Sequence, residues 1–280
     1  MKFNKTEIMG IINLTPDSFS GDGLLIQKDP ALSALEQAGH FIEQGATILD
    51  IGAESTRPGA SPVDEEEELK RVIPAVQTIR NAFPKITISI DTYKASVAEA
   101  ALKAGANWIN DVWGFRADPE MKHVAAAFQA PSILMHNRST PNNTKIEKNL
   151  GGHYIGVKYS NLIENIKSEL MLSVNLALEA GLDKDKIIID PGIGFGKTVE
   201  QNLRVLKDLS AFKSLGFPLL IGPSRKSFVG YTLNLLPSER LEGTIAAAVI
   251  GFLNGADIIR VHDVEAIFRA IRFAESVQAS

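Results

Sequence analysis

Short apolar runs alternate with longer segments of helical periodicity along nearly the whole chain. Eight of these runs predict β-strands, at residues 8–12, 48–51, 86–90, 108–109, 132–135, 187–189, 218–221 and 257–261. The segments that follow them predict helices, at residues 31–44, 64–82, 95–103, 120–128, 156–180, 199–209, 240–253 and 264–276. Strands that are apolar on both faces are typical of a parallel sheet covered by helices.

Strand and helix alternate eight times within 280 residues. This repetition favours a (β/α)8 TIM barrel over an open, doubly wound sheet. No change in composition marks a second domain, so we expect a single barrel domain over residues 1–280. Segment 137–148 is polar and lacks helical periodicity, and we expect it to form a long mobile loop after the fifth strand.

Composition and charge narrow the class of protein. Apolar residues make up 45% of the chain, as in a globular protein with a substantial core. The net charge of −4 argues against a nucleic-acid or membrane-surface binder. The chain has no cysteine, which excludes disulfides, thiolate nucleophiles and cysteine-ligated metals. No signal-peptide pattern is present at the N-terminus, and we expect a cytoplasmic protein.

Polar residues follow nearly every predicted strand. In a barrel the carboxyl ends of the strands converge on one mouth, where catalytic groups sit, so we expect the functional site there. Taken singly, Asp91, Asp190 and Asp263 also fit as caps of the helices that follow them. The clusters are residues 13–20, 50–59, 91–92, 110–111, 136, 190–192, 224–227 and 260–263.

These polar residues fall into two chemical sets. The first set offers hydrogen-bond acceptors that suit a flat heterocycle with several N–H donors, and consists of Asp91, Asn110 and Asp190. The second set is cationic or can become so, suits a phosphate or carboxylate, and consists of Arg57, Lys226, Arg260 and His262. The alternative for the cations is a solvated rim or structural ion pairs with Asp17, Glu54 or Asp263.

Three other polar features give weaker indications of function. The amide oxygen of Asn13 is a hard ligand that suits a hydrated Mg²⁺. Segment 192–198 resembles a phosphate-binding loop, but its spacing is one residue short, and we expect a tight turn whose backbone N–H groups line the mouth. His123, His153 and the acidic run 64–68 are assigned to the surface or to a helix start.

Seven segments together resemble the dihydropteroate synthase family of folate biosynthesis. They are residues 9–20 (MGIINLTPDSFS), 50–59 (DIGAESTRPG), 89–94 (SIDTYK), 109–111 (IND), 189–198 (IDPGIGFGKT), 222–228 (GPSRKSF) and 260–264 (RVHDV). The resemblance implies a homodimeric TIM barrel with its active site at the carboxyl ends of the strands. It also implies a transferase that joins 6-hydroxymethyl-7,8-dihydropterin pyrophosphate to p-aminobenzoate, giving 7,8-dihydropteroate and pyrophosphate.

The resemblance assigns roles to matching positions. It implies that the pterin pocket is lined by Asp91, Asn110, Asp190 and Lys226, and that Asn13 holds Mg²⁺. The residues implied for the pyrophosphate end are Thr56, Arg57, Arg260 and His262. Those implied to face p-aminobenzoate are Phe195 and Ser227. The loops around residues 17–19 and 57–59 are expected to close over the reacting centre.

The chain departs from the family's usual pattern at two loops. Its first loop reads Ser-Phe-Ser-Gly-Asp-Gly at residues 18–23, which moves the acidic residue by one place. After the fifth strand, residues 136–139 read His-Asn-Arg-Ser where the family has His-Met-x-Gly.

We expect SN1-like cleavage of the carbon–oxygen bond at the pterin methylene, followed by attack of the neutral aniline nitrogen. Mg²⁺ and the cations Arg57, Arg260 and His262 would stabilise the leaving pyrophosphate, with Asp91 and Lys226 as further catalytic residues. Two alternatives remain at this point, a pterin-binding methyltransferase barrel and a non-catalytic pterin-binding homologue.

Overall fold

The computed structural model describes residues 1, 3–15, 29–54, 63–147, 150–155 and 157–280. Eight parallel strands form one sheet in the spatial order β8-β5-β4-β3-β2-β1-β10-β9. A parallel bridge between Ile189 and Leu219 joins the two ends of this sheet, so the strands make a nearly closed barrel. The bounds of the strands are β1 (Glu7–Asn13), β2 (Ile48–Gly52), β3 (Thr87–Asp91), β4 (Trp108–Asp111), β5 (Ser132–Met135), β8 (Ile187–Asp190), β9 (Leu220–Ile221) and β10 (Ile258–Val261).

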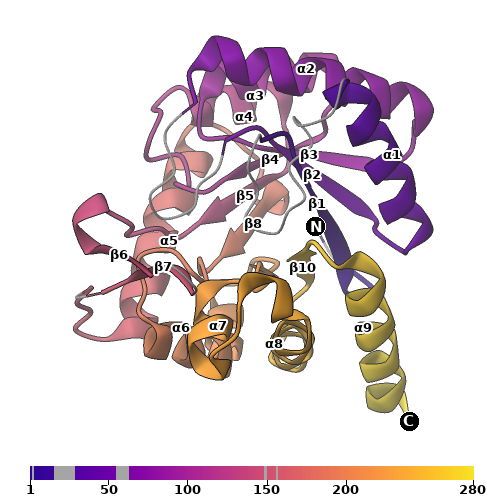
Figure 1. The fold of residues 1–280 in the computed structure, drawn as a ribbon. Helices are drawn as coiled ribbons and strands as arrows, with labels where there is room; N and C mark the ends of the chain where they lie inside the picture. The colour runs from indigo at the N-terminus through magenta and orange to yellow at the C-terminus, as the bar shows by residue number, and fades with distance from the viewer. Residues whose placement is uncertain (2, 16–28, 55–62, 148–149, 156) are drawn as a thin grey trace.

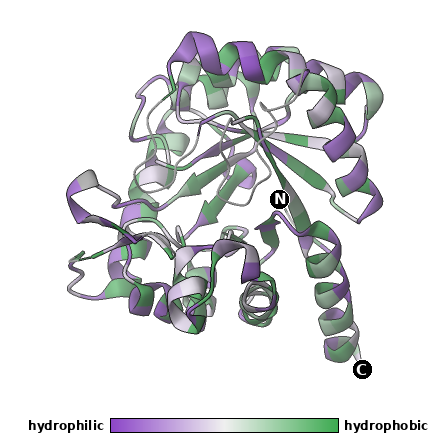
Figure 2. Ribbon diagram, viewed as in Figure 1, coloured by the Kyte–Doolittle hydropathy of each residue, from purple (hydrophilic) through white to green (hydrophobic). Residues whose placement is uncertain are grey.

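Helices surround this barrel and cover its outer face (Figure 1). Colouring by hydropathy shows apolar strands at the centre and polar positions along the outward sides of the helices (Figure 2). The predicted (β/α)8 barrel and its eight strands are therefore confirmed. The bounds of the helices are α1 (Pro30–Glu43), α2 (Glu65–Ala82), α3 (Ala95–Ala104), α4 (Met121–Phe128), α5 (Leu162–Glu179), α6 (Val199–Lys207), α7 (Ser227–Leu233), α8 (Leu241–Leu253) and α9 (Val264–Ala279).

Side-chain caps fix where several helices begin. The Asp64 carboxylate accepts the backbone N–H of Glu67 at 2.8 Å and caps the start of α2. The first turn of α2 is acidic, and its negative charges interact favourably with the positive end of the helix dipole. At α5 the predicted start at residue 156 is wrong. The side chain of Asn161 accepts the N–H of Glu164 at 3.3 Å, so the helix begins at Leu162.

Three further elements were not predicted, the strands β6 and β7 and the helix α7. Segment 137–148, expected to be a loop, contains strand β6 (Thr144–Glu147), which pairs antiparallel with β7 (Gly151–Tyr154). This expectation is therefore corrected: most of the segment's second half is an ordered hairpin outside the barrel. Helix α7 follows β9 after residues 222–226 and has only seven residues. None of the described helices is long and apolar enough to cross a membrane.

Inside the barrel, an apolar layer lies towards the amino ends of the strands and a polar layer lies towards their carboxyl ends. Its apolar layer consists of Met9, Ile48, Trp108, Ile133, Ile188, Leu220 and Ile258. Side chains of a strand alternate between its two faces, so the residue two places further along points to the same side. On β2, β4, β8 and β10 those positions hold Asp50, Asn110, Asp190 and Arg260. The polar mouth thus rests on an apolar plug.

Candidate active site

Arg260 lies between two carboxylates inside the barrel. Its Nε donates to Asp50 Oδ2 at 2.5 Å, and its Nη2 donates to Asp91 Oδ2 at 2.5 Å. Asn110 Nδ2 donates to the same Asp50 oxygen at 3.0 Å. The structure therefore brings three predicted site residues together: Arg260 contacts Asp91 directly and is joined to Asn110 through Asp50, a member of a predicted polar cluster with no predicted role. The acceptor set and the cationic set meet here and are not separate in space.

The charges in this cluster depend on one another. Burial raises the pKa of Asp91 to about 7, although the positive charge of Arg260 acts in the opposite direction. Burial also disfavours the charged form of Arg260, but Asp50 and Asp91 outweigh this effect and raise the pKa of the guanidinium. Any ligand that engages Arg260 will therefore change the balance that sets the charge of Asp91.

A second group forms around Asp190, at the end of β8. Its Oδ1 accepts the backbone N–H of Gly192 at 2.7 Å, and the residue is almost fully buried. Burial raises the pKa of Asp190, whereas the neighbouring charge of Lys226 lowers it. Asp190 therefore caps the following turn and not a helix. Asp91 likewise pairs with Arg260, so neither residue acts as the simple helix cap that was the alternative.

Lys226 connects this group to the turn after β8. It precedes the first residue of α7, Ser227, and its Nζ donates to the carbonyl oxygen of Ile193. The same nitrogen lies 4.5 Å from the centre of the Phe195 ring. Burial lowers the pKa of Lys226 to about 8, against the opposing effect of Asp190. The residues expected to face pterin and p-aminobenzoate are thus neighbours here.

The turn itself depends on glycine. Gly192, Gly194 and Gly196 have φ values of 70°, 85° and 57°, in the left-handed region that favours glycine. We expected the backbone N–H groups of this turn to line the mouth, but not all of them do. Gly194 N–H donates to Asn202 Oδ1 at 2.6 Å, and Phe195 N–H donates to the Gly192 carbonyl at 3.1 Å. The expectation is corrected for these two groups, which the protein itself binds.

The remaining predicted residues lie around the rim or outside the described part of the chain. Asn13 ends β1 beside Gly52, and Gly52 is in register with Asp91 on β3. His262 follows β10, and its Nδ1 lies 2.9 Å from Ser224 Oγ. Outside the described residues are Thr56, Arg57 and the two loops around residues 17–19 and 57–59.

Two polar residues lie elsewhere than expected. His136 was placed among the mouth clusters, but its side chain is fully buried and its Nε2 lies 3.1 Å from Glu169 Oε2 on α5. Because it directly follows Met135, which is in register with Asp190, it points to the opposite side, towards the helices. The acidic run, assigned to the surface or to a helix start, does form the first turn of α2. Its last member, Glu68, is nevertheless buried and pairs with Lys94 Nζ at 2.5 Å.

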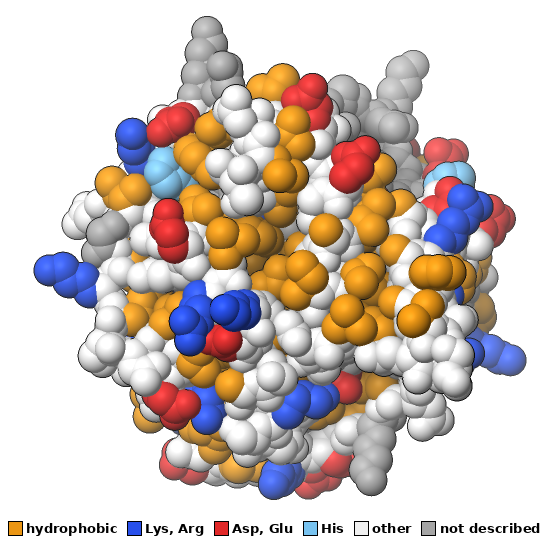
Figure 3. Space-filling view, turned by 90° about the horizontal axis from the view of Figure 1, so that it is seen from below, with side chains coloured by type: hydrophobic (Ala, Val, Ile, Leu, Met, Phe, Trp, Pro, Cys, Tyr) orange, Lys and Arg blue, Asp and Glu red, His pale blue; other side chains and the backbone are white. Residues whose placement is uncertain are grey.

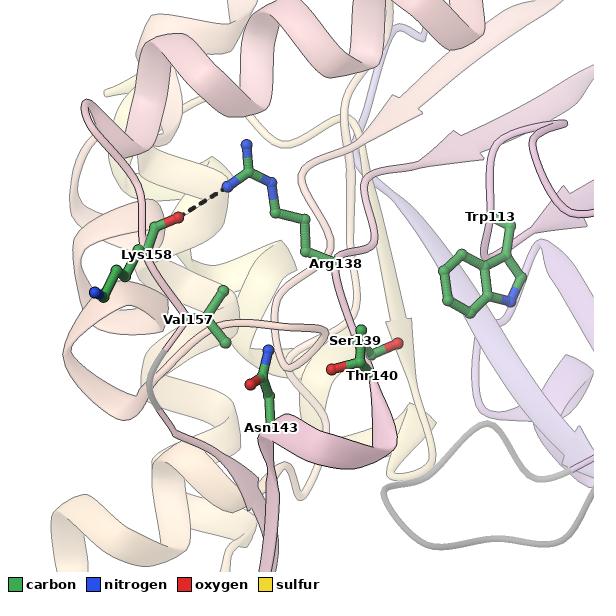
Figure 4. A pocket seen from close by; sticks show the side chains of 7 residues that line it. All are labelled: Trp113, Arg138, Ser139, Thr140, Asn143, Val157 and Lys158. Atoms are coloured by element: carbon green, nitrogen blue, oxygen red, sulfur yellow. Dashed lines mark hydrogen bonds between the residues drawn. The ribbon is translucent and has the colours of Figure 1, made fainter.

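A cavity of about 520 Å³ lies beside the mouth, between the segments that follow β4 and β5. Figure 4 shows the indole of Trp113 on one side and the guanidinium of Arg138 on the other. Arg138 Nη1 donates to the carbonyl oxygen of Lys158 at 2.9 Å. This wall therefore contains Arg138, one of the residues at which the chain departs from the family pattern.

Comparison with known proteins gives a consistent result. The family described as pterin binding enzyme matches residues 9–262. The dihydropteroate synthase of Clostridium beijerinckii is 47% identical over 274 residues, which cover 98% of this chain and 94% of that protein. The dihydropteroate synthase of Escherichia coli K12 is 40% identical over 269 residues, which cover 96% and 90%.

Solved structures of dihydropteroate synthases are similar to this chain over nearly its whole length. A dihydropteroate synthase from Clostridium difficile, crystallised in the presence of pteroic acid, has a TM-score of 0.88 and 43% identity and covers 100% of both chains. The enzyme from Xanthomonas albilineans with 4-aminobenzoic acid has a TM-score of 0.88 and 36% identity, covering 99% of this chain and 94% of the other.

Proposed function

Because this chain belongs to the dihydropteroate synthase family of pterin-binding enzymes, it is a transferase of folate synthesis, and we propose how its barrel mouth does the work. The proposed reaction joins 6-hydroxymethyl-7,8-dihydropterin pyrophosphate to p-aminobenzoate and releases pyrophosphate. The observation that carries this proposal is that the mouth brings together buried Asn110 and Asp190 with Asp91, which pairs with Arg260, while Lys226 lies over the Phe195 ring. It offers a flat donor-rich ring its acceptors and offers a second ring an aromatic face.

The pterin would enter the barrel with its pyrimidine edge towards Asp190. A ring N–H beside an exocyclic NH₂ gives two parallel donors, which match the two oxygens of a carboxylate. Asn110 is fixed by its bond to Asp50 and would contact the same ring. A site of buried polar groups discriminates strongly against rings that leave those groups unpaired.

The carbon–oxygen bond at the pterin methylene would break first, in an SN1-like step. The electron pair leaves with pyrophosphate, and the positive charge that remains is spread over the pterin ring near Asp91. The neutral aniline nitrogen of p-aminobenzoate then attacks the methylene carbon and afterwards loses a proton. Closure of the first two loops would exclude water, which otherwise gives the hydroxymethylpterin. No covalent bond to the enzyme is needed.

The pyrophosphate end is assigned to Thr56, Arg57, Arg260 and His262. Preorganised cations at the leaving group stabilise charge as it develops. Arg260 would have to share its donors between the phosphate and the two carboxylates that it contacts. Arg260 would thus couple the charge of the leaving group to the charge of Asp91 by electrostatic interaction.

Asn13 fits a magnesium ion that the substrate brings with it. Its amide oxygen is a hard donor at the rim, and the described residues include no group of three or more His, Asp or Glu that could hold a metal. Such a donor set suits an ion whose other ligands are water and phosphate oxygens. When bound, Mg²⁺ would neutralise part of the pyrophosphate charge.

We also propose a homodimer that works in the cytoplasm. The side formed by α6, α7 and α8 carries exposed apolar side chains, and Figure 3 shows them gathered across this face. They are Leu203, Leu233, Leu236, Ile250 and Leu253. Contiguous exposed apolar groups mark association surfaces. Sedimentation analysis should give the dimer mass, and Ile250→Glu should give the monomer.

The proposed location in the cytoplasm is supported by the absence of cysteine, which suits a reducing compartment.

Release of pyrophosphate on mixing both substrates tests the reaction. The proposed enzyme releases pyrophosphate in steady state only when p-aminobenzoate is present. A methyltransferase barrel would release none, and a non-catalytic homologue would bind the pterin without turnover. Either outcome would overturn the proposal.

A further inference from the structure

Lys197 is buried beneath the turn that carries Phe195. Its Nζ lies 2.8 Å from the carbonyl oxygen of Gly192, 3.0 Å from that of Phe195 and 2.9 Å from His136 Nδ1. An ammonium group has three N–H donors, and here each finds one acceptor. Burying a charged amine is costly unless it is fully hydrogen-bonded, so this arrangement is a built one.

Behind Lys197 the hydrogen bonds have a fixed direction. As an ammonium, which it is below its pKa of about 7 (lowered by burial), Lys197 can only donate, so Nδ1 of His136 accepts from it. The ring hydrogen is then on Nε2, which donates to Glu169 Oε2 at 3.1 Å. Burial, with the charge of Lys197, lowers the pKa of His136 to about 4, in agreement with a neutral ring. Arg138 completes the series, since its Nε donates to the same Glu169 oxygen at 3.0 Å.

A second arm reaches the turn from Arg138. The guanidinium lies 4.3 Å from the centre of the Tyr159 ring, and the Tyr159 hydroxyl donates to the carbonyl oxygen of Gly196 at 3.0 Å. A side chain at Gly196 would collide with the backbone of Arg138. The carbonyls of residues 192, 195 and 196 are therefore all held from behind by one assembly.

We propose that this assembly, the Glu169 network of Lys197, His136, Glu169, Arg138 and Tyr159, positions the turn so that Phe195 is presented to p-aminobenzoate. The inference rests on the proposed function, which places that substrate against Phe195. The members are positioning residues, because the contacts they make with the turn go to its backbone carbonyls and not to the Phe195 ring. Arg138 gives the altered loop after β5 a role in this chain.

The consequence is selective. Asp91 and Asn110 are held by Arg260 and Asp50, and Asp190 contacts the turn at Gly192, whereas Tyr159 holds it at Gly196. Loosening the Gly196 side of the turn should therefore weaken the capture of p-aminobenzoate and leave pterin binding nearly unchanged. A residue that served only stability would change both or neither.

Tyr159→Phe tests this with the smallest change, because it removes one hydroxyl and keeps the ring under Arg138. We expect the KM for p-aminobenzoate to rise about three- to tenfold, the effect of losing one net hydrogen bond, while the Kd of the pterin pyrophosphate stays within about twofold. Tyr231→Phe is the matched control. Its hydroxyl also donates to a backbone carbonyl, that of Gly151 at 3.2 Å, but on the outer hairpin. It should change neither constant.

Lys197→Met is the stronger variant and should raise the same KM further. If it does not fold, Tyr159→Phe decides the matter alone. If the wild type is active and Tyr159→Phe leaves the KM for p-aminobenzoate unchanged, the inference alone is overturned. The same holds if the variant weakens the binding of both ligands in parallel. A wild type that releases no pyrophosphate would overturn the proposed function.

Discussion

Arg260 and Asp50 form an ion pair inside the barrel, in which Nε lies 2.5 Å from Oδ2 and the Asp50 side chain is fully buried. The pair joins β10 to β2 across the interior. Asp50 also accepts from Asn110, whereas its Oδ1 has no hydrogen-bond partner among the described residues. One carboxylate therefore orients an arginine and an amide of the proposed pterin pocket.

Removing that carboxylate should be costly. Asp50→Ala leaves the Arg260 charge with one carboxylate and the Asn110 amide without its acceptor. We expect the free energy of unfolding to fall by about 3–5 kcal/mol, the range for breaking a buried ion pair. Urea unfolding at neutral pH measures this.

Asp50→Asn is the control, because it keeps an acceptor oxygen and the shape of the side chain. It should cost clearly less stability than Asp50→Ala but should still weaken pterin binding. Equal stability losses in both variants would contradict the view that the acceptor oxygen orients these partners.

The charge of Glu169 should make part of the stability depend on pH. Burial alone would raise its pKa, but hydrogen bonds from His136 and Arg138 lower it to about 2. A carboxyl whose pKa is lowered by folding stabilises fully above its ordinary value of 4.5 and loses this effect as pH falls towards 2. Glu169→Gln should therefore unfold at lower urea concentration at pH 7, and the gap should narrow below about pH 4.5.

Glu164→Gln, on the same helix but exposed, is the matched control. Its unfolding midpoint should stay close to that of the wild type across the same range. A gap for Glu169→Gln that stays constant from pH 7 to pH 3 would show that its charge does not contribute.

The sequence predicted the barrel because its strands are continuous apolar runs. It failed where that signal is missing. Helix α7 has seven residues with Gly230 among them, too few for a visible period, and β6 buries none of its four residues. The predicted start of α5 was too early because the Asn161 side chain caps the helix, which begins at Leu162.

The site was predictable as far as strand alternation reaches. Asp190 and Asn110 sit two residues beyond inward apolar positions, and the same rule would have given Asp50 from Ile48. It would also have excluded His136, which is one residue past the inward Met135. The burial of Lys197 had no such signal, because its partners are His136, which follows β5, and carbonyls of the turn itself.

Magnesium dependence should be visible in binding as well as in turnover. The wild type should bind the pterin pyrophosphate more tightly with Mg²⁺ than with excess chelator, as measured by calorimetry. Asn13→Ala should reduce this difference at least about tenfold, since even outer-shell partners of a metal typically carry that much. The bare pterin alcohol, which has no phosphate, is the control ligand. Binding and pyrophosphate release that are undiminished in chelator would contradict the prediction.

Asp190→Asn should abolish pterin recognition while the barrel stays folded. The amide keeps one oxygen, which can still accept the Gly192 N–H and so preserve the turn. Its NH₂ group then replaces the second oxygen, and one of the two pterin contacts becomes donor against donor. We expect pterin affinity to fall by about 3–5 kcal/mol, because a mismatched buried polar pair discriminates steeply. The melting curve should stay close to that of the wild type. Calorimetric titration with the dihydropterin decides: an affinity within twofold of the wild type would mean that Asp190 serves only the turn and that the pterin binds elsewhere.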